Sequence, residues 1–171
     1  MCIRDRNTAV RLRPSNDFKP YFVRGGFLTK QGRHREAMAD FLKVFKEVPE
    51  LPGLVPNMLY AQRKLGLCHE VENNATAALR IDAKAIDILN LRALCRNAAG
   101  SSDSAWADVR RSLRLDPLND QTLLIGAVVR AAAHDTATAC LLMDRMKNTL
   151  LVDDELDSLH KAMVRTCKGM R

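Results

Sequence analysis

The feature that most constrains the fold of this chain is an internal repeat with a period of 34 residues. The first copy is marked by a glycine, a small residue, two larger apolar residues and a proline, at Gly32, Ala37, Phe41, Val44 and Pro49. Three further steps of 34 give Gly66, Val71, Ala75, Ala78 and Ala83, then Gly100, Ala105, Val109, Ser112 and Pro117, then His134, Ala139, Met143, Met146 and Leu151. Four copies stay in phase without an insertion, and such a period is typical of stacked supersecondary units.

Apolar residues within a copy recur in steps of three and four, which is the spacing of an amphipathic helix. One such series is Ala37, Phe41, Leu42, Val44, Phe45 and Val48. With 8 Gly, 6 Pro and 5% aromatic residues, the chain is poor in the residues that build β-sandwiches and phosphate-binding loops. The sequence therefore predicts an all-α fold, with two helices of about 12 to 14 residues and a short turn in each copy.

The leading helix of the first copy reads Tyr21-x2-Arg24-Gly25-x2-Leu28. Together with the period, this segment resembles the tetratricopeptide repeat (TPR) family, whose helix–turn–helix unit carries W-x2-L-G-x2-Y in its first helix. Arg24 departs from that pattern, and the second and fourth copies lack the closing proline. The resemblance implies a right-handed α-solenoid of four repeats, in which the first helix of each repeat lines a concave, protein-binding face.

Three segments follow from this period. Residues 1–17 form a lead-in, residues 18–153 hold the repeats 18–51, 52–85, 86–119 and 120–153, and residues 154–171 form a capping helix. The capping helix begins with acids, ends with bases and carries one apolar stripe of Leu156, Leu159, Met163 and Cys167. Such a charge order suits the helix dipole, and a single apolar stripe can seal the last repeat of a stack.

The first six residues, Met1 to Arg6, resemble the translation of a sequencing-library adapter rather than a part of the protein. On this interpretation the natural start of the chain is missing. Removing these residues takes away two Arg and one Asp, so the formal net charge falls from +7 to +6.

Residues that share a place in successive first helices lie 34 apart, so the lining of the concave groove can be predicted from the sequence. The candidate groove residues are Lys19, Phe22, Lys30, Asn57, Tyr60, Arg63, Lys64, Asn90 and Asn97. Asn amides can hold a peptide backbone, Lys and Arg attract carboxylates, and aromatic rings accept apolar side chains. The expected partner is a peptide or a helix of acidic character. In the fourth repeat, Leu124, Ile125 and Val128 are expected beneath the capping helix.

One TPR subtype can be tested residue by residue. Co-chaperones of this family clamp the C-terminal carboxylate of heat-shock chaperones with Lys and Asn in the first repeat, Asn in the second, and Lys and Arg in the third. The matching positions here hold Phe22, Gly26, Asn57, Asp87 and Leu91, of which only Asn57 agrees. That clamp is therefore not expected in this chain.

The sequence contains no motif that indicates catalysis, a cofactor or a metal site. Glycine-rich phosphate loops, G-x-S-x-G and H-E-x-x-H are absent, and the four dispersed histidines, His34, His69, His134 and His160, have no second histidine or cysteine at helical spacing. The longest apolar stretch is interrupted at Arg130, which is too early for a membrane span. We therefore expect a non-enzymatic protein without cofactors that does not insert into membranes.

The arginines Arg110, Arg111 and Arg114 are predicted to lie on a solvated helix face with ion pairs to Asp103, Asp108 and Asp116. A nucleic-acid site is a weaker interpretation, because the net charge is modest and related RNA-binding helical repeats have a period of 35 rather than 34.

The cysteines Cys68, Cys95, Cys140 and Cys167 fall inside apolar helical patterns, and no C-x-x-C pair occurs. This favours free thiols in a reducing compartment, and hence the cytoplasm, although an even number of cysteines also permits disulfides. Trp106, the sole tryptophan, is expected to pack between repeats, with a hot spot for a partner as the alternative.

The function predicted from these observations is a protein–protein interaction module, such as an adaptor, a scaffold or a co-chaperone-like protein. A second hypothesis is that the chain is the recognition or oligomerisation part of a larger TPR-fused enzyme. RNA binding is the weakest of the three.

Overall fold

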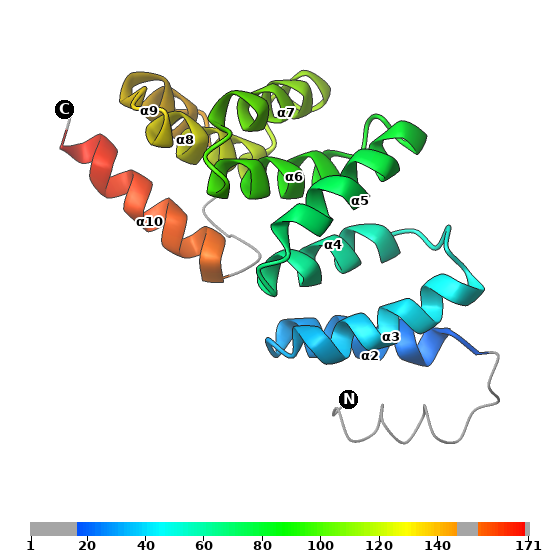
Figure 1. Ribbon diagram of the computed structural model, residues 1–171. Coiled ribbons are helices and arrows are strands. Elements are labelled where there is room, and N and C mark those ends of the chain that lie inside the picture. Colours follow the sequence, from blue (N-terminus) through cyan, green and yellow to red (C-terminus); the bar gives the residue numbers. More distant parts are fainter. Residues whose placement is uncertain (1–16, 147–153, 170–171) are drawn as a thin grey trace. The chain divides into compact units, whose positions relative to one another are not determined.

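The computed structural model describes residues 17–146 and 154–169, and the regular structure in these ranges is helical (Figure 1). The helices are α2 Lys19–Lys30, α3 His34–Glu47, α4 Leu54–Lys64, α5 Cys68–Ile81, α6 Ile86–Ala98, α7 Ser102–Leu115, α8 Asp120–Ala132, α9 Thr136–Asp144 and α10 Asp154–Lys168. The predicted all-α fold is confirmed, and α2 to α9 supply two helices to each predicted repeat. The adapter-like segment, most of the lead-in and residues 147–153 lie outside the described residues.

The chain divides between Asn74 and Ala75 into two compact units, each with its own core. The core of the first unit is formed by Leu28, Ala37, Phe41, Val44 and Leu54. The core of the second unit includes Ala93, Ala105, Val109, Leu123, Leu124, Ile125, Ala127, Val129, Ala139 and Leu142, and it continues into Leu156 and Met163 of α10. Consecutive helices pack as hairpins, namely α2 with α3, α6 with α7, and α8 with α9.

The turns inside the hairpins share one backbone conformation. Gly32, Gly66 and Gly100 have φ values of 74°, 78° and 78°, and His134, 34 residues after Gly100, has a φ of 61°. In the last hairpin the N–H of Asp135 donates to the carbonyl of Arg130 at 2.9 Å, and the first hairpin makes the same bond between Arg33 and Leu28. These bonds close the end of the leading helix in the manner of a Schellman motif. The repeated glycine is thus required by a left-handed turn.

His134 carries a side chain in a conformation that favours glycine, so it is a position where stability can be gained. His134→Gly is expected to raise the free energy of unfolding by about 1 kcal/mol, because the left-handed conformation costs a residue with a Cβ about that much. Gly100→Ala, at the same place in the preceding hairpin, is expected to lower it by a similar amount. Urea unfolding of both variants measures the effect, and a destabilised His134→Gly variant would contradict the interpretation.

A glycine also brings the first two helices together. A Cβ on Gly25 would lie 2.6 Å from Cε1 of Phe41, so α2 can approach α3 this closely only without a side chain at position 25. In the second unit, a Cβ on Gly126 would lie 2.9 Å from Cγ1 of Val109 and 3.4 Å from Cζ3 of Trp106. Trp106 packs against the core of the second unit, as predicted from the sequence.

Ion pairs between an arginine and a buried aspartate join the two helices of alternate repeats. In the first unit, Arg24 Nε donates to Asp40 Oδ2 at 2.6 Å. In the second unit, Arg92 Nε donates to Asp108 Oδ2 at 2.9 Å, and Arg92 Nη2 donates to Asp108 Oδ1 at 2.7 Å. Each arginine precedes its aspartate by 16 residues, and the two pairs are two periods apart. Arg24, which replaces the leucine of the family pattern, is therefore neutralised by the carboxylate of Asp40.

The predicted ion pairs of Arg110, Arg111 and Arg114 with Asp103, Asp108 and Asp116 are wrong, because none of them forms among the described residues and Arg111 donates to the Ala83 carbonyl instead. Asp108 is 4% exposed and pairs with Arg92 and Arg96 of α6, rather than with the arginines of its own helix. The reason is helical rotation: Asp108 lies on the face of α7 that packs against α6, whereas Arg110 and Arg114 are exposed.

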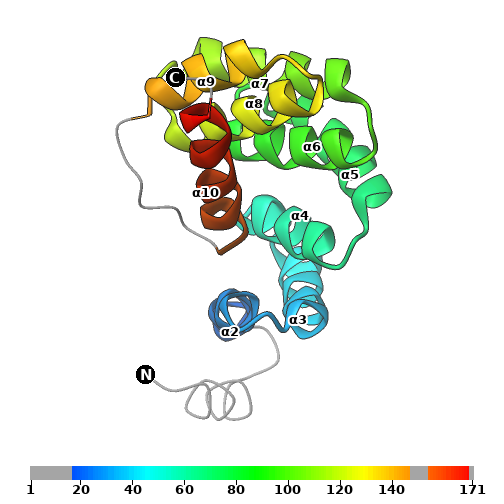
Figure 2. The same ribbon diagram turned by 90° about the vertical axis from the view of Figure 1, so that its left-hand side faces the viewer.

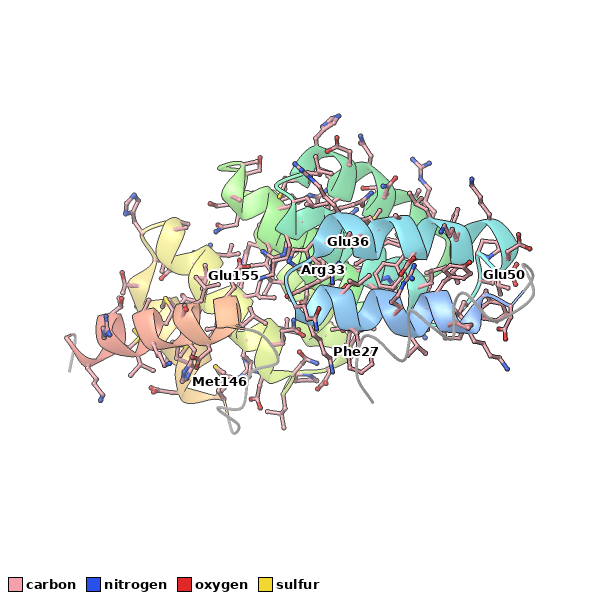
Figure 3. All side chains as sticks on the ribbon, turned by 90° about the horizontal axis from the view of Figure 1, so that it is seen from below. Phe27, Arg33, Glu36, Glu50, Met146 and Glu155 are labelled. Atoms are coloured by element: carbon pink, nitrogen blue, oxygen red, sulfur yellow. A yellow bond between two sulfur atoms is a disulfide. The ribbon has the colours of Figure 1, made fainter. Side chains whose placement is uncertain are left out.

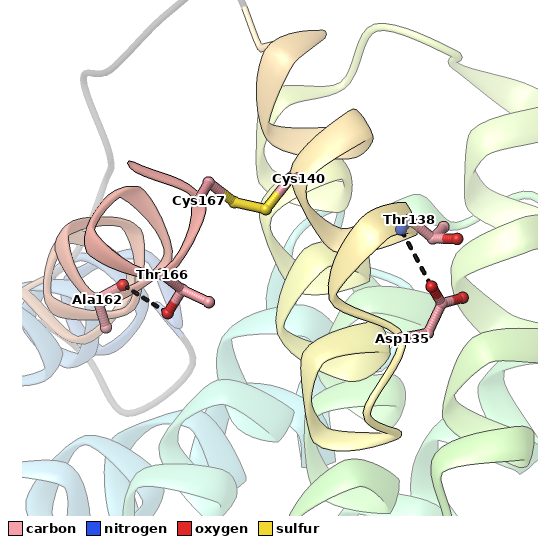
Figure 4. The surroundings of a disulfide bond; sticks show 6 residues. All are labelled: Asp135, Thr138, Cys140, Ala162, Thr166 and Cys167. Atoms are coloured by element: carbon pink, nitrogen blue, oxygen red, sulfur yellow. Dashed lines mark hydrogen bonds between the residues drawn. A yellow bond between two sulfur atoms is a disulfide. The ribbon is translucent and has the colours of Figure 1, made fainter. Parts of the chain in front are cut away.

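The prediction of free thiols is also wrong. Cys140 of α9 and Cys167 of α10 form a disulfide with an S–S distance of 2.02 Å (Figure 4). Cys68 and Cys95 are disulfide-bonded as well. The apolar helical pattern correctly indicated that these positions face a packed surface, but it carries no information about which sulfur lies opposite, because the two sulfurs come from different helices.

Helix α10 packs against α8 and α9 (Figure 2). Its buried residues Leu156 and Met163 belong to the same apolar cluster as Leu124 and Ile125, and Val128 packs against this cluster. Leu124, Ile125 and Val128 are therefore covered within the second unit and are not open to a partner.

Candidate functional site

Five of the predicted groove residues of the first unit form two groups, one near each end of α4. The first group consists of Asn57, at the start of α4, and Phe22 of α2. A Cβ on Gly53 would lie 3.8 Å from Nδ2 of Asn57 and 4.0 Å from Cζ of Phe22, so both side chains border the same point of the backbone. The Asn57 amide donates to the Gly53 carbonyl at 2.8 Å, and the Phe22 ring centroid lies 6.1 Å from that of Phe41. We call Phe22 and Asn57 the amide–aromatic pair.

The second group lies at the end of α4 and consists of Tyr60, Arg63, Lys64 and His34, which we call the basic cluster. Lys64 Nζ lies 5.3 Å and Arg63 Cζ lies 5.8 Å from the centroid of the Tyr60 ring, within range of cation–π attraction. The His34 ring, at the start of α3, meets the Tyr60 ring edge-on at 6.1 Å. Three of the four residues were predicted from the sequence. His34 was not, because it lies on the second helix of its repeat.

The positive charge of the basic cluster affects the pKa of His34. Burial and the charges of Lys64 and Arg63, in that order of importance, lower the pKa of His34 below its ordinary value of 6.5. Its Nδ1 is buried without a hydrogen-bond partner among the described residues. The site is therefore positive and partly desolvated, and these conditions strengthen the attraction of an anion.

The acid nearest in sequence to the basic cluster is engaged elsewhere. Glu36 Oε1 accepts a hydrogen bond from Arg33 Nε at 2.7 Å, and both side chains lie at the start of α3 (Figure 3). This hydrogen bond and the charge of Arg33 hold the pKa of Glu36 below its usual range. Glu36 is thus ionised and paired with Arg33.

His34 allows the potential of the basic cluster to be measured. We expect its pKa in the folded protein to lie below 6.5 and to rise in Lys64→Gln, because one of the two repelling charges is removed. Since the folded-state pKa is lower than the unfolded one, the unfolded state binds more protons in this range, and stability is lost as the pH falls from 6.5 through the folded-state pKa. An NMR titration of the ring protons measures the pKa. A Lys64→Gln variant with a lower His34 pKa would contradict this assignment.

The two lysines predicted for the groove lie on α2 and are exposed. Lys19 is the first residue of α2 and Lys30 is the last, so they are roughly 16 Å apart along the helix axis. Lys30 precedes the turn that leads to His34, whereas Lys19 lies at the other end of the helix. Both add positive charge to the first unit, but the structure does not bring them into one site.

The prediction that Asn90 lines the groove is wrong. Asn90 is 1% exposed, its Nδ2 donates to Thr122 Oγ1 at 2.9 Å, and its Oδ1 accepts from Ser112 Oγ at 3.3 Å. This network ties α6 to α7 and α8, so the amide is unavailable to a partner. The period correctly predicted that the position lies on a first helix, but the residue faces the next hairpin. Asn97, also on α6, is half-buried in the second unit and stays a prediction.

Neither a cluster of metal-ligating side chains nor a membrane-spanning helix occurs in the part of the chain that the structure describes. Within residues 17–146 and 154–169, no three His, Cys, Asp or Glu side chains are placed so that they could hold a metal ion. The helices of these ranges also include none with the length and apolar character that a membrane span requires.

Comparison with known proteins gives matches among solved structures only. No family model matches the chain, and no curated protein matches it. TTC0263, a thermophilic TPR protein from Thermus thermophilus, has a TM-score of 0.75 at 16% identity, over 90% of this chain and 83% of that one. YrrB, described as a TPR protein with an unusual peptide-binding site, has a TM-score of 0.66 at 14% identity, and the match covers 98% of this chain and 81% of YrrB.

A third similar structure is the first TPR of Spaghetti (RPAP3) bound to the HSP90 peptide SRMEEVD. Its TM-score is 0.63 at 22% identity, over 71% of this chain and 96% of that one. At these identities the likeness concerns the fold alone. The chain thus has the all-α helical-repeat fold of TPR proteins, in agreement with its 34-residue period.

Proposed function

We propose that this protein is a non-enzymatic interaction module that binds an acidic peptide along α4 of its first unit. The observation that carries the proposal is the arrangement of the two groups at opposite ends of α4, with Phe22 contributed by α2 and His34 by α3. The amide–aromatic pair lies at the start of α4 and the basic cluster lies at its end. Asn57 and Lys64 are seven residues apart on nearly the same face of α4, or roughly 10 Å along the helix, a distance that about three residues of an extended peptide can span.

Each group has a chemical task in this proposal. In the basic cluster, Arg63 and Lys64 attract a carboxylate of the peptide, and Tyr60 holds their side chains near its ring face. At the other end, Phe22 offers an apolar surface and Asn57 offers the remaining hydrogen-bonding capacity of its amide to the peptide backbone. Lys19 and Lys30 add long-range attraction, which weakens as salt is added.

Two of the similar structures support a peptide as the kind of partner. YrrB is described as having an unusual peptide-binding site, and the RPAP3 repeat is bound to a chaperone peptide. We do not extend the chaperone clamp to this chain, because Phe22 and Gly26 stand where that clamp has Lys and Asn in its first repeat. The amide of Asn57, the one residue that agrees, also donates to a carbonyl of its own chain.

The experiment measures the binding of fluorescent heptapeptides of acidic, neutral and basic composition to the full chain by fluorescence anisotropy. We expect the acidic peptides to bind best, and the combined variant Asn57→Ala, Lys64→Glu to weaken them by about tenfold or more at low salt. The matched control is Asn73→Ala, Lys46→Glu, which makes the same changes at exposed positions of the same unit. Unchanged affinity in the α4 variant, or a preference for basic peptides, would remove the support for this site.

The disulfide bonds indicate the kind of cellular compartment in which the protein resides. Disulfide bonds persist in oxidising compartments and are rare in the cytosol. The bond between Cys140 and Cys167 therefore favours an oxidising compartment over the cytoplasm that was predicted on the assumption of free thiols. Mass spectrometry after alkylation of the protein from its native source tests this proposal, because oxidised cysteines take up no label before reduction.

A further inference from the structure

A groove of about 480 Å³ lies on the second unit, between the second helices of the third and fourth repeats. Its walls come from α7 and from α9 with its C-terminal cap, and the first helices α6 and α8 contribute no residue to it. We call it the outer groove and define it by Trp106, Arg110, Arg114, Leu141 and Arg145. None of its lining residues lies on α4 or belongs to the groove residues predicted from the sequence.

The rim of the outer groove is basic. Arg110 and Arg114 are exposed, lie one turn apart on α7 and, among the described residues, take part in no hydrogen bond or ion pair. Arg145 faces them from the end of α9, where its Nη2 donates to the carbonyl of Pro117 at 2.7 Å. No carboxylate lines the groove. Like charges at i and i+4 repel each other, so this rim is stabilised when an anion lies between them.

The remaining lining of the outer groove is largely apolar. Trp106, Leu113 and Leu142 contribute to it, and Leu141 is 65% exposed at its edge. An exposed leucine beside an indole and two further leucines is a surface that burial against a partner would stabilise. The disulfide does not cover the groove. Thr138 lines the groove, and Cys140 projects from the opposite side of α9 (Figure 4).

We infer that the outer groove binds an acidic amphipathic helix of another protein. The apolar face of such a helix would fill the space between α7 and α9, as in other helix-in-groove complexes. Arg110 and Arg114 are roughly 6 Å apart along α7, so glutamates at i and i+4 of the partner helix can pair with both. The basic rim and apolar floor together specify this partner, since a purely acidic ligand would leave Leu141 exposed.

Trp106 gives this proposal a direct readout, because it is the sole tryptophan of the chain and it lines the groove. The probe is a blocked peptide of roughly 15 residues made of Ala, Leu and Glu, with Leu at i, i+3, i+4 and i+7. Titrated into the full chain, it is expected to shift the emission of Trp106 to the blue in a saturable manner. A second peptide with Lys in place of Glu, and a third with Ala in place of Leu, are expected to have little effect.

The variant Arg110→Glu, Arg114→Glu is expected to weaken the Trp106 response at least tenfold while the far-UV circular dichroism stays unchanged, because both side chains are exposed. The control Arg80→Glu, Lys84→Glu changes the charge of the same unit equally at other exposed positions and is expected to bind within twofold of the original chain. The Asn57→Ala, Lys64→Glu variant is expected to keep the Trp106 response, so failure of the α4 site and failure of the outer groove are distinguishable.

Three results would overturn the inference. The first is peptide binding without a change in Trp106 emission, or with undiminished affinity in Arg110→Glu, Arg114→Glu. The second is a blue shift of Trp106 emission that grows with protein concentration in the absence of peptide, because a second copy of the chain would then occupy the groove. The third is displacement of the Glu peptide by a single-stranded RNA homopolymer that binds more tightly and is weakened by the same variant.

Discussion

Replacing Asp108 with alanine is expected to lower the free energy of unfolding of the second unit by about 3–5 kcal/mol. The side chains of Arg92 and Asp108 are 9% and 5% exposed, and Asp108 also accepts from Arg96 Nη1 at 3.0 Å. Removing the one carboxylate leaves Arg92 buried without its counter-ion, while its bond to Thr76 Oγ1, 2.8 Å long, cannot replace the lost charge. Breaking a buried pair from one side is costly for this reason.

Urea unfolding, followed by circular dichroism, measures this effect. Asp103→Ala is the matched control, because Asp103 is an exposed acid at the start of the same helix, and its loss is expected to cost less than about 1 kcal/mol. Asp40→Ala in the first unit is expected to have a smaller effect than Asp108→Ala, since Arg24 is 20% exposed and keeps some contact with water. A cost below about 1 kcal/mol for Asp108→Ala would show that the pair contributes little.

The second large effect is expected from the disulfide between α9 and α10. Cys140 and Cys167 are 27 residues apart, and opening a loop of this length is expected to reduce stability by roughly 3.5 kcal/mol. The double variant Cys140→Ser, Cys167→Ser therefore loses the tether of the helix that covers Leu124 and Ile125. Faster amide hydrogen exchange in α10, and binding of a hydrophobic dye, are the expected signs that this apolar surface opens.

The double variant is preferable to a reducing agent, because reduction also changes Cys68 and Cys95. The control is Ser158→Ala, Thr166→Ala, which places two substitutions at exposed sites of α10 and leaves the bridge intact. If hydrogen exchange in α10 were as slow in the cysteine variant as in the original chain, the packing of Leu156 and Met163 alone would hold the helix.

Local and periodic features of this protein could be predicted from its sequence. The period of 34 residues predicted the pairs of helices, and it placed Gly32, Gly66, Gly100 and His134 at equivalent turns, all of which have a positive φ. These features are set by the backbone of a few neighbouring residues, so the residue types carry the information. The grouping of Tyr60, Arg63 and Lys64 was predictable for the same reason, because i+3 and i+4 neighbours share a helix face.

Contacts between helices were decided by the tertiary structure alone. The rotation of α6 turns Asn90 into a buried network and Arg92 toward Asp108, and the approach of α10 to α9 joins Cys140 to Cys167. The outer groove likewise exists only because α7 and α9 place their arginines and leucines opposite each other. A repeat period specifies which helix a residue occupies. The packing of that helix against its neighbours decides whether the side chain is buried, paired or open to a partner.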